Sequence, residues 1–176
     1  MKVEITRWKT NSKEDKWRKG SIKKCVVEVG YGDDWNGDWT IATIVLPLLK
    51  RIKENKHGAP CVNDEDVPEE LRSTSCAPKE NEWDTDENFF KRWDYAMNEI
   101  IFAMEEIAND KENEPPYHTK HGEMTFGEIN PSTKTGEIKF EGWESTPESE
   151  AANKAYHERI QNGCRLFGTY MMAMWD

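Results

Sequence analysis

An acidic, aromatic stretch near residue 35 holds the side chains with the clearest chemical potential: Asp33, Asp34, Trp35, Asp38 and Trp39. Carboxylates between a strand and a helix can bind Mg²⁺ or Ca²⁺, which prefer oxygen ligands. The stretch departs from an EF-hand loop because Ile44 stands where the terminal glutamate belongs. The alternative is a turn and helix-capping segment with two core tryptophans. We expect a binding loop that needs no metal ion or cofactor.

Two other groups have metal-ligating or nucleophilic side chains. His118 and His121 form a close pair, but no Cys or acid stands at ligand spacing, and an exposed polar connection is the alternative. Cys61 and Cys76 could bind zinc with His57, or form a thiol–imidazole pair with it. Structural zinc sites favour closer cysteine pairs. Neither group predicts a catalytic centre.

A cluster of helical acids resembles the carboxylates of all-helical nucleotide pyrophosphohydrolases. Its members are Glu99, Glu105, Glu106 and Asp110. The cluster lacks the paired spacing on two helices that would hold the metal ions of such an enzyme. A Walker loop and a dinucleotide fingerprint are also missing. A metal-dependent hydrolase of nucleotides or phosphoesters is therefore only an alternative.

Tryptophans that the core cannot accommodate form a class of site that needs no motif. The candidates are Trp8, Trp17, Trp35, Trp39, Trp83 and Trp143. Any of them left exposed beside acids would make a patch for a protein or a stacked base. The predicted binding residues are Asp33, Asp34, Trp35, Asp38, Trp39 and Trp83.

The composition limits the partners. The 176 residues include 34 acids against 24 Lys and Arg, for a net charge of −10. Such a charge argues against direct nucleic-acid binding and against an anionic membrane surface. An acidic chain can instead meet a basic surface on another protein. The four cysteines form no CxxC pair, and we find neither a signal peptide nor a long apolar run, so we expect a cytosolic protein with free thiols.

Three long helices and two strand pairs must position these side chains. The expected elements are strands 3–8 and 22–29, helix 39–56, an irregular stretch at 59–84, helix 86–109, a hairpin at 123–128 and 137–141, and helix 147–174. The fold class is therefore α+β: three long packed helices with one or two short antiparallel hairpins, in a single domain over 1–176.

Local signals refine this outline. Asp38 is expected to cap the first helix, and Thr146 with Pro147 to open the last. Gly163 and Gly168 are expected to permit close helix–helix approach. One apolar stripe is expected on the core side of the first helix: Ile41, Ile44, Val45, Leu48, Leu49 and Ile52.

Several stretches resemble an uncharacterised family of tailed-bacteriophage proteins. They include Asp38-Trp39-Thr40-Ile41-Ala42, Lys56-His57-Gly58-Ala59-Pro60, Lys79-Glu80-Asn81-Glu82-Trp83-Asp84 and Tyr156-His157-Glu158-Arg159-Ile160, with further matches in 64–75, 90–94 and 165–168. The family has no assigned activity, so the resemblance transfers no functional residue. Residues 1–30 and 110–150 depart from its pattern. The resemblance implies a phage gene product made in an infected bacterium.

The leading hypothesis is a non-catalytic binding protein in the host-cell cytoplasm. It would block a host factor or a defence system, or sequester a ligand. The expected partner is a protein, either from the host or a second copy of the chain, and not a membrane or a nucleic acid. The alternatives are a virion accessory protein and the metal-dependent hydrolase.

Overall fold

The computed structural model describes residues 2–7, 22–30, 33, 35–109, 123–141 and 146–174. These residues form three α-helices and two antiparallel two-stranded sheets, so the predicted α+β class is confirmed. The elements are β1 (Lys2–Arg7), β2 (Ile22–Glu28), α1 (Gly37–Asn55), α2 (Phe89–Ala108), β3 (Glu123–Phe126), β4 (Ile138–Glu141) and α3 (Pro147–Tyr170). Within this described part, no helix is both long and apolar enough to cross a membrane.

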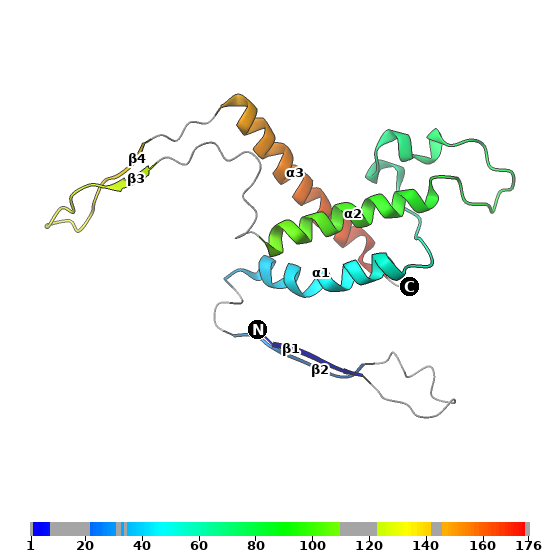
Figure 1. The fold of residues 1–176 in the computed structure, drawn as a ribbon, viewed down its shortest axis with the longest axis horizontal. Helices are drawn as coiled ribbons and strands as arrows, with labels where there is room; N and C mark the ends of the chain where they lie inside the picture. The colour runs from blue at the N-terminus through cyan, green and yellow to red at the C-terminus, as the bar shows by residue number, and fades with distance from the viewer. Residues whose placement is uncertain are drawn as a thin grey trace.

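The central helix of the body is α2, which packs against α1 and α3 (Figure 1). Spacings of three and four along its sequence bury Trp93, Met97 and Ile100. Leu49 of α1 and Leu166 of α3 complete the set of fully buried large side chains. Each such side chain contributes about 1.5–3 kcal/mol when it leaves water.

Helix α3 approaches α2 closely at Gly163. A Cβ atom at this position would lie 2.4 Å from the Glu99 carbonyl oxygen and 2.5 Å from the Ala103 Cβ. The predicted close approach is therefore present here. The same prediction is wrong for Gly168, because a Cβ added there meets nothing within 4 Å.

The helix starts differ in how they are capped. Thr146 caps α3 as predicted: its Oγ1 accepts from the Ser149 backbone N–H, while the Ser149 Oγ accepts from the Thr146 N–H. For α1 the predicted cap is wrong, because the helix begins at Gly37 and Asp38 lies within its first turn. The Asp38 charge still suits the positive end of the helix dipole.

The apolar stripe of α1 does not lie wholly on the core side, contrary to the prediction. Ala42 and Leu49 are buried, but Ile41, Ile44 and Leu48 are 56, 41 and 59% exposed. At 100° per residue, these three side chains form one strip on the flank of the helix, well away from the Ala42–Leu49 direction. Since α1 packs chiefly against α2, this flank is left uncovered. We call Ile41, Ile44 and Leu48 the α1 flank.

Residues 56–88 form an irregular segment with short 3₁₀ turns: η2 (Asp64–Asp66), η3 (Glu69–Leu71) and η4 (Ser73–Ser75). The turn at η3 follows Pro68. Val62 and Val67 are buried against the helices. The segment is therefore attached to the body despite its lack of regular structure.

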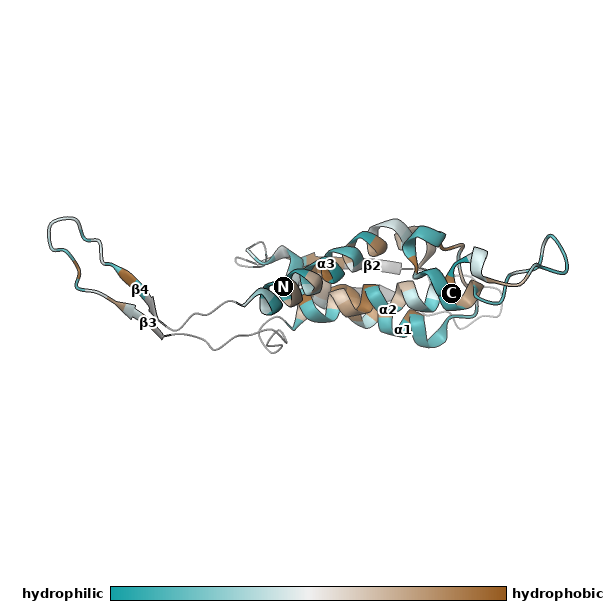
Figure 2. Ribbon diagram, turned by 90° about the horizontal axis from the view of Figure 1, so that it is seen from above, coloured by the Kyte–Doolittle hydropathy of each residue, from teal (hydrophilic) through white to brown (hydrophobic). Residues whose placement is uncertain are grey.

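The two hairpins are placed differently in the molecule. The pair β1–β2, with Val3 opposite Val27, lies beyond α1 on the side away from α2, and a gap separates it from α1 in Figure 1. The pair β3–β4, with Met124 opposite Phe140 and Phe126 opposite Ile138, projects away from the helices in two perpendicular views (Figures 1 and 2). We call residues 123–141 the arm.

Candidate binding surfaces

The structure separates the predicted binding residues into two places. The indole Nε1 of Trp39 donates to the Ala108 carbonyl at 2.8 Å, so the start of α1 lies at the end of α2. Trp83 instead lies shortly before the start of α2. Since α2 has 20 residues, it is about 30 Å long, and Trp83 is at the opposite end of the body from Trp39. Asp34 lies outside the described residues.

Asp33 organises the turn between β2 and α1. Its carboxylate accepts the Gly30 backbone N–H at 2.6 Å, and this hydrogen bond lowers the pKa of the carboxyl group. Its backbone carbonyl accepts from the Thr40 hydroxyl at 3.1 Å. Asp38 is exposed. Among the described residues, no group of three or more His, Cys, Asp or Glu side chains could hold a metal ion.

The tryptophans of this loop are not core residues. Trp35 is 77% exposed and Trp39 is 41% exposed. The alternative interpretation, a turn and capping segment with two core tryptophans, is therefore wrong about the tryptophans. Trp39 nevertheless has a structural role, because its hydrogen bond to Ala108 joins α1 to α2. Of the two tryptophans, Trp35 is the more accessible.

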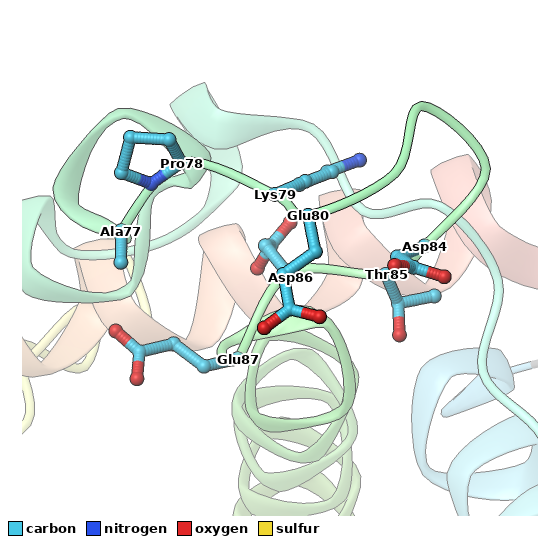
Figure 3. A pocket seen from close by; sticks show the side chains of 8 residues that line it. All are labelled: Ala77, Pro78, Lys79, Glu80, Asp84, Thr85, Asp86 and Glu87. Atoms are coloured by element: carbon cyan, nitrogen blue, oxygen red, sulfur yellow. The ribbon is translucent and has the colours of Figure 1, made fainter.

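Trp83, 84% exposed, lies in the loop that borders an open cleft of about 410 Å³ (Figure 3). The lining residues are Ala77, Pro78, Lys79, Glu80, Asp84, Thr85, Asp86 and Glu87. Four acids against one lysine give this cleft a negative character. One of these four acids, Asp86, forms hydrogen bonds with neighbouring residues outside the cleft.

Asp86 is held as an anion by the buried Arg92. The two side chains form a bidentate pair, with N–O distances of 2.9 and 2.7 Å. Asp86 also accepts from the Asn88 backbone N–H and from the Cys76 thiol. The hydrogen bonds from Arg92 are the main reason that the pKa of Asp86 falls to about 2. Asp86 is therefore a structural anion. The other three acids, Glu80, Asp84 and Glu87, line the cleft beside it.

A second buried network attaches the irregular segment to α3. The Asp66 carboxylate accepts from the Tyr170 hydroxyl at 2.5 Å and forms an ion pair with Arg165 at 2.7 Å. Burial raises the pKa of Asp66, but the hydrogen bonds from Tyr170 and Arg165 outweigh it and leave that pKa below its usual value. Burial and the Asp66 contact raise the pKa of Tyr170 to about 12. Sequence reasoning missed this network.

The helical acids considered for metal binding make contacts between helices. Glu99 pairs with Arg159 of α3 at 2.7 Å, and Glu105 pairs with Lys50 of α1 at 2.6 Å. Glu106 accepts from the Tyr156 hydroxyl. Asp110 lies outside the described residues. The three described acids therefore position helices, which accounts for their location without a metal ion.

The remaining cysteine and histidine candidates do not form a site in the described chain. The Cys76 thiol lies within hydrogen-bond distance of both Asp86 and the Arg72 carbonyl, and its single hydrogen can be donated to either. Cys61 is an exposed free thiol. His118 and His121 lie outside the described residues.

Comparison with protein-family models, with curated proteins and with solved structures gave no match. The surfaces of this chain are therefore what indicates its function. Two of them expose large apolar side chains in a regular pattern: the α1 flank and the arm.

Proposed function

We propose that the chain is a non-catalytic binding protein that docks onto a protein partner through the α1 flank. The observation that carries the proposal is the exposure of Ile41, Ile44 and Leu48 on a helix whose other side is fixed in the core. Their spacing is i, i+3 and i+7, the pattern by which a helix inserts into an apolar groove. Because α1 is already folded and anchored, binding would cost little conformational entropy.

The chemistry of the flank defines the kind of partner. About half of each of the three side chains is still exposed, so its burial in a complex would contribute roughly 1 kcal/mol per side chain. The partner must therefore offer an apolar groove that accepts a helix. The net charge of −10 would speed encounter with a groove set in a basic surface.

The resemblance to tailed-phage proteins supports a cellular setting for this interaction. The partner would be a host protein in the cytoplasm of an infected bacterium, such as a host enzyme or a component of a defence system. The chain would act by occupying a surface of that protein and would need no catalytic group of its own.

Co-purification with matched variants tests the proposal. Tagged wild-type chain, Leu48→Glu and Thr43→Glu would each be recovered from infected cells, and the bound proteins identified by mass spectrometry. Thr43 is exposed on another side of α1 and receives the same new charge. We expect one stoichiometric host protein with the wild type and Thr43→Glu, and its loss with Leu48→Glu. Equal recovery with all three chains would contradict the proposal.

A virion accessory protein is the second candidate, and the projecting arm favours it. The arm extends away from the body (Figure 1), so it could reach a neighbouring protein in a particle. A blot of purified particles separates the two candidates. A strong signal in particles, with no host protein recovered from cells, would favour the accessory role.

A further inference from the structure

We draw no further inference here: the strongest candidate, the acidic cleft that Glu80, Asp84 and Glu87 line ahead of helix α2 (Figure 3), is a cluster of carboxylates, and no second feature among the described residues indicates what would bind there.

Discussion

The hydroxyl of Tyr170 donates a hydrogen bond to the Asp66 carboxylate at 2.5 Å, although 104 positions separate the two residues. The same hydroxyl accepts from the Asn63 backbone N–H at 3.0 Å. The Tyr170 hydroxyl, at the end of α3, therefore makes two hydrogen bonds that fix η2 to the helices. Through this contact and the Asp86–Arg92 pair, the irregular segment keeps a fixed position.

Replacing Tyr170 by Phe should destabilise the fold. The change keeps the ring against Trp93 but leaves the buried Asp66 carboxylate and the Asn63 N–H with one partner fewer. An unsatisfied buried polar group costs about 1–3 kcal/mol, and urea unfolding should show a loss of this size. Tyr156→Phe is the control. It removes the hydroxyl that donates to Glu106 in a less buried position, and it should lower the free energy of unfolding by a smaller amount. Equal losses would argue against a special role for Tyr170.

The Asp86–Arg92 pair should make stability depend on pH at the acid end. The pKa of Asp86 is about 2 in the folded chain against an ordinary value of 3.8. A lowered folded-state pKa gives stability that is present above 3.8 and is lost as the pH falls toward 2. The difference corresponds to about 2 kcal/mol. Asp86→Asn should be less stable than the wild type at neutral pH and should lose less stability across this window. Parallel pH profiles for the two proteins would contradict this assignment.

The glycines of α3 provide a matched pair. Gly163→Ala should destabilise the fold by about 1–3 kcal/mol, because its methyl group would overlap the Glu99 carbonyl. Gly168→Ala, in the same helix with open space around it, should stabilise the fold by about 0.5–1 kcal/mol. Chemical denaturation measures both changes. If the two variants shifted stability in the same direction, the close crossing of α2 and α3 would be wrong.

Adjacent leucines of α1 test whether the flank is a surface. Leu49 is fully buried and Leu48 is 59% exposed. Leu49→Ala should cost about 2–5 kcal/mol of unfolding free energy, whereas Leu48→Ala should change it by no more than about 0.5 kcal/mol. Similar costs would mean that the flank is already covered within the chain.

Local sequence patterns predicted the helices and strands, because each of these elements is determined mainly by residues that are close together in the sequence. The spacing of Trp93, Met97 and Ile100 identifies the core side of α2 directly, and Thr146 with Pro147 identifies the start of α3. The alternation of Met124 and Phe126, and of Ile138 and Phe140, predicted the hairpin, and the register itself comes from the structure. Each of these signals spans only a few positions or one turn.

Long-range partners could not be predicted in this way. Asp66 belongs to a run of acids that is typical of a solvated turn, and only the arrival of Tyr170 and Arg165 from α3 makes it a buried anion. The α1 stripe predicted a core face, but how much of it is covered depends on whether a second neighbour packs there. Trp83 and Trp39 are at opposite ends of α2 because α1 and α2 run antiparallel, a feature of the tertiary fold.

Site-specific photo-crosslinking from α1 tests the proposed docking surface most directly. A photoreactive amino acid would replace Leu48 in one chain and Thr43 in another, and both would be irradiated in infected cells. The proposal predicts one defined protein crosslinked from position 48 and none from position 43. Equal crosslinking from both positions, or none from position 48, would contradict the assignment of the α1 flank as a binding site.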